Sequence, residues 1–215
     1  MMFSILIPIF NNFKLFCDAA DSILSQTFFN YEVIVCDQSN DGTSQLIKNK
    51  CIEHGFKYVK SDIPSLFKAR RTLIENANGK YLVWLDSDDR LKSNALSTLN
   101  TFIKQFNNPD MCFYAWSTIS ETNALINELV FVDCNDLDVS FISKNTFLER
   151  MLLSSDYNDL WNKCFSIDVY RKCLEEPIEE ISMGEDFVRV QQLVQCCEKI
   201  ILINCPLYEY RINST

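Results

Sequence analysis

The chain has 215 residues, of which 47% are hydrophobic and 23% are charged, and its 29 acidic and 20 basic residues give a net charge of −9. This length accommodates one α/β domain with a substantial core. The acidic balance argues against a nucleic-acid partner and against a purely electrostatic attachment to anionic lipid, because both need a basic surface.

Strands and helices alternate through the first half of the chain. Apolar runs predict strands over residues 3–10, 31–36, 56–59, 80–85 and 111–116. Segments of helical period predict helices over residues 13–26, 43–54, 66–76 and 93–106. This alternation predicts βαβ units and a doubly wound, mostly parallel sheet.

The second half of the chain is less regular. Helices are predicted near residues 145–153, 168–175 and 186–197, followed by a strand over 199–204. We see no repeat, low-complexity tract or linker between the halves, so we expect one domain with two functional parts, residues 1–116 and 117–215.

The ten cysteines have irregular spacing and include no C-x-x-C pair. Several, such as Cys36 and Cys205, lie within apolar runs, which favours buried thiols over a disulfide framework or a zinc site. The first residues lack the basic segment of a signal peptide, and no apolar run approaches the ~20 residues that span a bilayer. We therefore expect a cytoplasmic protein, at most peripheral to a membrane.

Polar side chains follow three of the predicted strands. Asn11 follows the first strand, Asp37 the second, and Asp86 with Asp88 follows the strand that ends at residue 85. Ligands of parallel sheets bind beyond the carboxyl ends of the strands, so we expect these side chains to converge. The four glycines form neither G-x-G-x-x-G nor a P-loop, which excludes the usual glycine cradles for phosphate.

The segment YLVWLDSDDRL ends an apolar run with three carboxylates within four positions. Asp86 and Asp88 share a face if the segment is extended, so both can bind one Mn²⁺ or Mg²⁺. The alternative is that these acids, Asp89 included, only form a solvated turn before the next helix.

Three further positions have structural alternatives. Asp37 lies in a segment that is also a good turn, and the acids Glu185 and Asp186 at a predicted helix start also favour the helix dipole. His54, the only histidine, lies near a predicted helix end, which argues against Ser-His-Asp and Cys-His catalysis.

Six motifs in order resemble the family 2 glycosyltransferases of GT-A fold. They are SILIPIFNN, EVIVCDQSNDGT, SLFKARRTLIENANGKYLVWLDSDDRL, LWNKCFSIDVY, GEDFVRVQQLV and CPLYEYRINST. The resemblance covers essentially the whole chain. It implies a Rossmann-like, GT-A type sheet whose first half binds a nucleotide sugar and whose more helical second half holds the acceptor and the catalytic base.

The resemblance also implies roles for the residues that match its motifs. Asp186 would be the general base, and Asp88 would be the direct metal ligand, with Asp86 beside it. The implied nucleotide-sugar contacts are Pro8, Phe10, Asn11, Asp37, Arg70, Asp86 and Arg211. The implied acceptor-side residues are Trp161, Lys163 and Glu185.

The activity that this resemblance implies is an inverting, Mn²⁺- or Mg²⁺-dependent transfer of a hexose or N-acetylhexosamine. The donor would be a UDP-sugar, and the acceptor a hydroxyl of a glycan, expected to be lipid-linked, in the synthesis of a bacterial O-antigen or capsule. The setting would be the inner face of the plasma membrane. Relatives commonly continue beyond YRINST, so a further C-terminal segment is expected.

Five positions depart from the family pattern, and two other functions stay open at this point. The departures are Cys36, Gln38, Ser65, Arg71 and Leu73. One alternative is a non-catalytic subunit of GT-A type that binds a nucleotide sugar or a partner enzyme. The other is a phosphatase resembling the haloacid dehalogenases, whose D-x-D pair normally follows the first strand.

Overall fold

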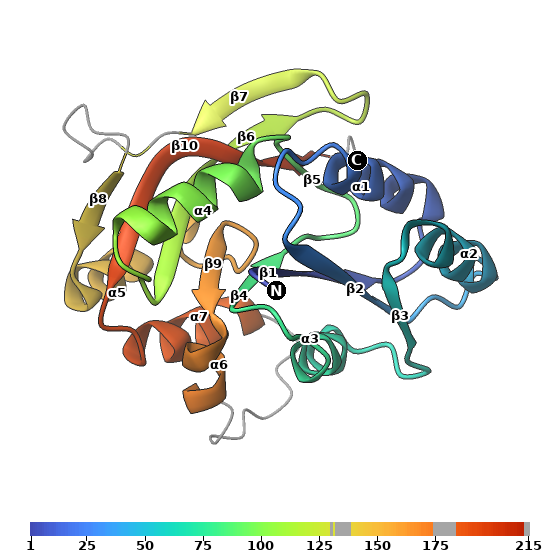
Figure 1. The fold of residues 1–215 in the computed structure, drawn as a ribbon, viewed down its shortest axis with the longest axis horizontal. Coiled ribbons are helices and arrows are strands. Elements are labelled where there is room, and N and C mark those ends of the chain that lie inside the picture. The colour runs from blue at the N-terminus through green and yellow to red at the C-terminus, as the bar shows by residue number, and fades with distance from the viewer. Residues whose placement is uncertain (130, 132–138, 174–183, 213–215) are drawn as a thin grey trace.

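The structure, a computed structural model, describes residues 1–129, 131, 139–173 and 184–212. In Figure 1 helices lie on both sides of a central sheet, with α1 above it and α3 below. The elements up to β6 are β1 (Phe3–Ile9), α1 (Phe13–Leu24), β2 (Tyr31–Asp37), α2 (Ser44–His54), β3 (Lys57–Lys60), α3 (Leu66–Glu75), β4 (Tyr81–Trp84), β5 (Arg90–Leu91), α4 (Ala95–Gln105) and β6 (Met111–Ile119).

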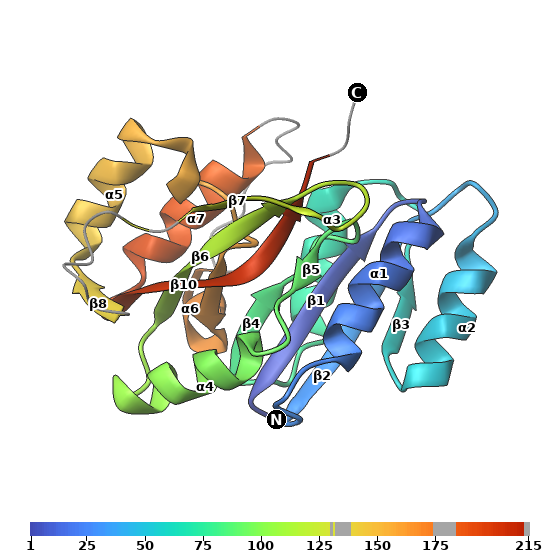
Figure 2. The same cartoon turned by 90° about the horizontal axis from the view of Figure 1, so that it is seen from above.

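The second half of the chain contributes both helices and strands. Its elements are β7 (Leu125–Leu129), β8 (Val139–Ile142), α5 (Lys144–Leu153), the 3₁₀ turn η1 (Ser155–Tyr157), β9 (Lys163–Ser166), α6 (Ile167–Cys173), α7 (Glu185–Gln195) and β10 (Ile200–Arg211). Figure 2 shows α5, α6 and α7 grouped at the end of the molecule opposite α2.

Within the described ranges, ten strands form one sheet with the order β3-β2-β1-β4-β9-β6-β10-β5, and β7 and β8 pair with β6 and β10. Strands β3, β2, β1 and β4 are mutually parallel. Strand β9 is antiparallel to both β4 and β6, and β10 is parallel to β6. The carboxyl ends of β1, β2, β4, β6 and β10 therefore lie along the same edge of the sheet.

The predicted fold class, a doubly wound and mostly parallel α/β sheet, is confirmed, and each predicted strand and helix has a counterpart. Strands β5, β7, β8 and β9 were not predicted. They are two to five residues long, and β7 is largely exposed, so they carry little of the apolar pattern that marks the other strands. Strand β10 also continues to Arg211, past a register shift around Pro206.

Strand β1 forms the centre of the core. All seven of its residues are buried, as expected for a strand whose two neighbours are parallel and whose faces are covered by helices. Helix α1 packs its apolar face, including Phe16 and Ile23, into the same core. Among the described helices, none is long and apolar enough to cross a membrane.

A tight contact joins the start of β1 to the turn before β4. The Gly79 amide donates to the Ser4 hydroxyl at 2.8 Å and to the Glu32 carboxylate at 3.1 Å. A Cβ atom at Gly79 would lie 2.4 Å from the Ser4 backbone nitrogen. Only glycine fits here without moving the main chain of β1.

We expect Gly79→Ala to lower the free energy of unfolding by about 2–3 kcal/mol, since overpacking against backbone forces a shift of the chain. Denaturant unfolding followed by circular dichroism would measure it. Gly42→Ala is the matched control, because Gly42 lies in open space and only its positive φ of 87° opposes alanine, at about 1 kcal/mol. Equal losses in the two variants would contradict this account of Gly79.

Candidate functional site

A cavity of about 450 Å³ opens at the carboxyl ends of β1, β2 and β4. It is lined by Pro8, Ile9, Phe10, Asn12, Gln38, Pro64, Ser65, Leu66, Asp86, Ser87 and Asp88. Four of the residues singled out from the sequence are thus brought together, namely Pro8, Phe10, Asp86 and Asp88. Phe10 is half exposed and presents an apolar surface to this cavity.

The loops that follow β1 and β2 are tied to each other by Asn11. Its amide donates to the Ser39 hydroxyl at 2.7 Å, and its side-chain oxygen accepts from the Asn40 amide at 2.9 Å. Asn11 and Asn12 both have positive φ, a conformation that asparagine tolerates better than most residues. In the structure Asn11 shapes the loops, and its contact with a nucleotide stays a prediction.

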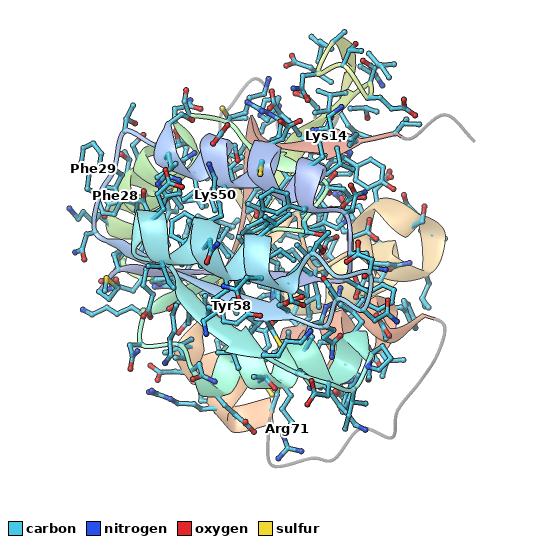
Figure 3. All side chains as sticks on the ribbon, turned by 90° about the vertical axis from the view of Figure 1, so that its right-hand side faces the viewer. Lys14, Phe28, Phe29, Lys50, Tyr58 and Arg71 are labelled. Carbon is cyan, nitrogen blue, oxygen red and sulfur yellow. The ribbon has the colours of Figure 1, made fainter. Side chains whose placement is uncertain are left out.

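Asp37 is fully buried, and its charge is compensated within the protein. One oxygen accepts from the Ser39 amide at 2.8 Å, and the other accepts from the Tyr58 hydroxyl at 2.8 Å and lies 3.5 Å from the Lys60 ammonium. Tyr58 is labelled in Figure 3. Burial by itself would raise the pKa of Asp37, but these hydrogen bonds outweigh it and the pKa is lowered. The contact of Asp37 with a nucleotide stays a prediction.

The three carboxylates of the DSDD segment have different environments. Asp89 points inward, where it accepts from the Tyr208 hydroxyl at 2.8 Å and from the Arg211 amide at 2.7 Å. Asp86 and Asp88 are partly exposed and line the cavity. Burial, together with the neighbouring carboxylates, raises the pKa of Asp86 to about 7, although Arg70 opposes this shift. The third acid is therefore structural, and two remain for a ligand.

These two carboxylates fit a divalent cation that is shared with a diphosphate. Mg²⁺ and Mn²⁺ prefer oxygen ligands and commonly take one or two carboxylates, with phosphate oxygens and water completing the shell. Among the residues that the structure describes, no group of three or more His, Cys, Asp or Glu side chains is arranged to hold a metal by itself. Asp86 and Asp88 would hold the cation only together with the substrate.

A second group of charges lies at the start of α7. The Arg70 guanidinium donates at short range to Asp186 and at 3.4 Å to Glu185, and it lies 5.7 Å from the ring centre of Trp84. The other oxygen of Asp186 accepts from the Leu160 amide at 3.2 Å. Burial raises the pKa of Glu185, with Arg70 opposing. The predicted base and its neighbour thus share one arginine.

Lys163 was expected to line a substrate cleft, and the structure corrects this. Its side chain is fully buried, donates to the Asp159 carbonyl and to the Asn162 side-chain oxygen, and lies 4.7 Å from the ring centre of Phe113. Through these two hydrogen bonds, the Lys163 side chain holds the loop before β9. That loop includes Leu160, whose amide holds Asp186.

Trp161 also has little exposed surface, at 7%. Its indole stacks on Tyr208 at 4.8 Å and on Tyr210 at 5.2 Å, measured between ring centres. It was expected to line the substrate cleft, and in the structure it packs between the buried Tyr208 and the more exposed Tyr210 as part of an aromatic group.

Arg211 was expected to reach phosphates, and the structure uses it otherwise. Its guanidinium is fully buried and donates to the main-chain carbonyls of Asp88 at 2.6 Å, Glu121 at 3.1 Å and Ser120 at 3.3 Å. It also pairs with Asp18 at 3.4 Å. These partners account for its charge, so Arg211 fixes the DSDD turn instead of extending into the cavity.

The five departures from the family pattern fall into three groups: two line the cavity, two are buried in the core, and one is exposed on a helix. Gln38 and Ser65 line the cavity, and Ser65 also caps α3 by accepting from the Lys68 amide. The cap was visible in the sequence as a serine before a helix, whereas the place in the cavity was not. Cys36 and Leu73 are buried in the core. Arg71 points away from the sheet in Figure 3 and pairs with Glu75 on its own helix.

The model of glycosyl transferase family 2 matches residues 4–171. The chain belongs to this family. It is 25% identical to the glycosyltransferase GlyA of Streptococcus pneumoniae, over 98% of this chain and 30% of GlyA. It is 23% identical to the glycosyltransferase GlyG of the same organism, over 99% of this chain and 71% of GlyG. The chain thus spans less than a third of GlyA.

Solved structures share the fold of this family member. TarS from S. aureus (residues 1–349) superposes with a TM-score of 0.81 and 17% identity, over 98% of this chain and 60% of TarS. TarS has also been solved in complex with UDP and with UDP-GlcNAc, at TM-scores of 0.80 and 0.81. The likeness confirms the GT-A type fold expected from the sequence.

The buried Lys163 gives a prediction about pH. Burial lowers its pKa to about 7, while the Asp159 carboxylate opposes the shift. The unfolded chain then binds a proton that the folded chain has given up between pH 7 and 10, so Lys163 makes stability rise with pH in this window. From pH 7 to pH 10, the free energy of unfolding of the wild type should therefore rise by about 1 kcal/mol or more relative to that of Lys163→Met. One pKa unit corresponds to about 1.4 kcal/mol.

Urea unfolding of both proteins at several pH values would measure this difference. Lys48→Met is the control, because Lys48 is exposed on α2 and its removal should leave the pH dependence unchanged. A constant difference between wild type and Lys163→Met across the window would contradict the lowered pKa.

Proposed function

We propose that the chain transfers a hexose or N-acetylhexosamine from a UDP-sugar to a hydroxyl of a glycan acceptor, with inversion at the anomeric carbon. The observation that carries this proposal is the pairing of two sites at one edge of the sheet. One is the cavity with Asp86 and Asp88, and the other is the acid pair Glu185 and Asp186, which Arg70 holds. Burial chiefly raises the pKa of Asp86, and both Arg70 and Asp186 act on it as neighbouring charges, which supports the closeness of the two sites.

On the donor side, the cavity supplies both kinds of contact that a nucleoside diphosphate needs. Phe10 and Pro8 offer apolar surface for a base, while Asp86 and Asp88 offer oxygens for a cation at the diphosphate. Bound there, Mn²⁺ or Mg²⁺ would neutralise the charge that develops on the departing diphosphate. The relative TarS has been solved with UDP and UDP-GlcNAc, which supports UDP as the nucleotide.

On the acceptor side, Asp186 is the proposed general base. It accepts the proton of the attacking hydroxyl on the face opposite the leaving diphosphate, as expected for a single displacement. Both of its oxygens are hydrogen-bonded in the structure, to Arg70 and to the Leu160 amide, so these bonds fix its orientation. Glu185 shares Arg70 and would position the acceptor.

The setting that we propose is the synthesis of a surface polysaccharide on a lipid-linked acceptor, at the inner face of the membrane. One relative, 21% identical over 99% of this chain and 23% of its own length, is the minor teichoic acid biosynthesis protein GgaB of Bacillus subtilis. Residues 1–116 would bind the donor in this scheme, and residues 117–215 would contribute the base and the acceptor contacts.

The donor site predicts metal-dependent nucleotide binding. Calorimetric titration should show that UDP binds in the presence of Mn²⁺ and that Asp88→Ala weakens this binding at least tenfold, because one of two carboxylates at the cation is lost. Asp168→Ala is the control, since Asp168 is an exposed carboxylate on α6. If UDP binds equally well without metal, or if Asp88→Ala has no effect, the cation site is wrong.

If Asp186 is the base, replacing it should reduce turnover without reducing donor binding. Asp186→Asn keeps the shape of the side chain but removes its ability to accept a proton, so sugar transfer should fall at least 100-fold while UDP affinity stays within threefold. Transfer from UDP-GlcNAc, UDP-glucose and UDP-galactose to a panel of glycosides, followed by mass spectrometry, measures it. Unchanged turnover would remove Asp186 as the base, and nucleotide binding with no turnover in either protein would favour a non-catalytic subunit.

A further inference from the structure

An aromatic ring close to the DSDD turn is open to solvent. Tyr210, near the end of β10, is 40% exposed, although it is part of an otherwise buried group of aromatic rings. Its ring is nearly parallel to the indole of Trp161, at an interplanar angle of 17° and a distance of 5.2 Å between centres. One face of Tyr210 is thus supported by the protein.

The residues beneath Tyr210 are themselves well packed. Trp161 is 7% exposed, stacks on the buried Tyr208 and meets Trp116 edge to face at 5.2 Å. The main-chain carbonyl of Trp161 accepts from the buried Tyr114 hydroxyl at 2.7 Å. Aromatic pairs in such geometries stabilise each other, so the stack on Trp161 favours the orientation of the Tyr210 ring seen here.

The neighbours of Tyr210 in the chain connect it to both parts of the proposed active site. The next residue, Arg211, donates from its amide to Asp89 at 2.7 Å and from its guanidinium to the Asp88 carbonyl at 2.6 Å. Trp161, beneath the ring, follows Leu160, whose amide holds Asp186. The ring is therefore close to the turn that carries Asp86 and Asp88, and it stacks on the loop whose Leu160 amide holds Asp186.

The electrostatic surroundings agree with this placement. The pKa of Tyr210 is raised, chiefly by burial and further by the carboxylates of Asp89, Asp159, Asp88 and Asp86. These carboxylates disfavour an anionic group in direct contact with the ring. A neutral group with an apolar face is the better match for the exposed face of Tyr210.

We propose that Tyr210 is a sugar-stacking residue, whose exposed face receives a hexopyranose ring at the reaction centre. The C–H groups on one face of a pyranose pack against the electron-rich face of an aromatic ring, while its hydroxyls stay free for polar partners. This inference rests on the proposed function. The sugar is either that of the donor or that of the acceptor, because both rings meet where transfer takes place.

The test compares Tyr210→Ala, Tyr210→Phe and the wild type in two binding assays with Mn²⁺. In the donor arm, calorimetry compares UDP with UDP-GlcNAc, UDP-glucose and UDP-galactose. In the acceptor arm, saturation-transfer NMR with UDP present measures the affinity of methyl glycosides of glucose, galactose and N-acetylglucosamine. Circular dichroism melting checks that each variant is folded, which we expect because Tyr210 is at the surface.

If the ring stacks on sugar, Tyr210→Ala should weaken at least one arm fivefold or more, whereas Tyr210→Phe, which keeps the ring, should stay within twofold of the wild type. Loss for UDP-sugars identifies the donor ring, and loss for glycosides identifies the acceptor ring. UDP itself should bind all three proteins alike. Unchanged sugar binding by Tyr210→Ala, equal loss for UDP alone, or no sugar binding by the wild type would each overturn the inference.

The experiment distinguishes failure of the stacking role from failure of the proposed function. If UDP does not bind the wild type with Mn²⁺, the donor site itself is wrong, and the inference about Tyr210 falls with it. If UDP binds but Tyr210 has no influence on any sugar, the donor site stands and the stacking role alone is rejected.

Discussion

One buried carboxylate, that of Asp89, joins the first half of the chain to its last strand. It accepts from the Tyr208 hydroxyl and from the Arg211 amide, and the same Tyr208 hydroxyl accepts from the Asp86 amide at 3.1 Å. Burial raises the pKa of Asp89 well above its usual range, so placing it in the core is costly. The hydrogen bonds offset that cost, and they fix the DSDD turn on β10.

The other parts of the site depend on this junction. Because Asp89 turns inward, Asp86 and Asp88 are left at the cavity. The side chain of Arg211 links this junction to the turn after β6, because it donates to the carbonyls of Ser120 and Glu121. The antiparallel strand β9 begins beside the carboxyl end of β4, and in the loop before it Trp161 stacks on Tyr208 of the same junction. Two distant halves of the sequence thereby build one site.

The parts of the fold that could be predicted from the sequence are those that a local residue pattern specifies. The strand–helix alternation of the first half is local, and it correctly predicted the parallel sheet. Strand β9 was missed because it contains the buried Lys163 in a run of four residues, and only its pairing with β4 and β6 makes it a strand. The sequence carries no local mark of such long-range pairing.

The same limit applies to predicting the residues of the candidate site. A polar residue after an apolar run can face a ligand or can satisfy a buried group of the protein, and the sequence pattern is the same in both cases. Asp86 and Asp88 reach the cavity, whereas Asp37, Lys163 and Arg211 find their partners inside the fold. Which of the two applies depends on residues far away in the chain.

The acid pair at the start of α7 shows why two adjacent carboxylates are useful next to one arginine. Arg70 is largely buried and is itself stabilised as a cation by Asp186, Asp86 and Glu185. If Asp186 accepts a proton during transfer, it loses its charge, and an arginine with a single partner would then be a buried and uncompensated cation. Glu185, already 3.4 Å from the same guanidinium, keeps a counter-charge in place. The pair therefore allows a proton to arrive at Asp186 without leaving Arg70 alone.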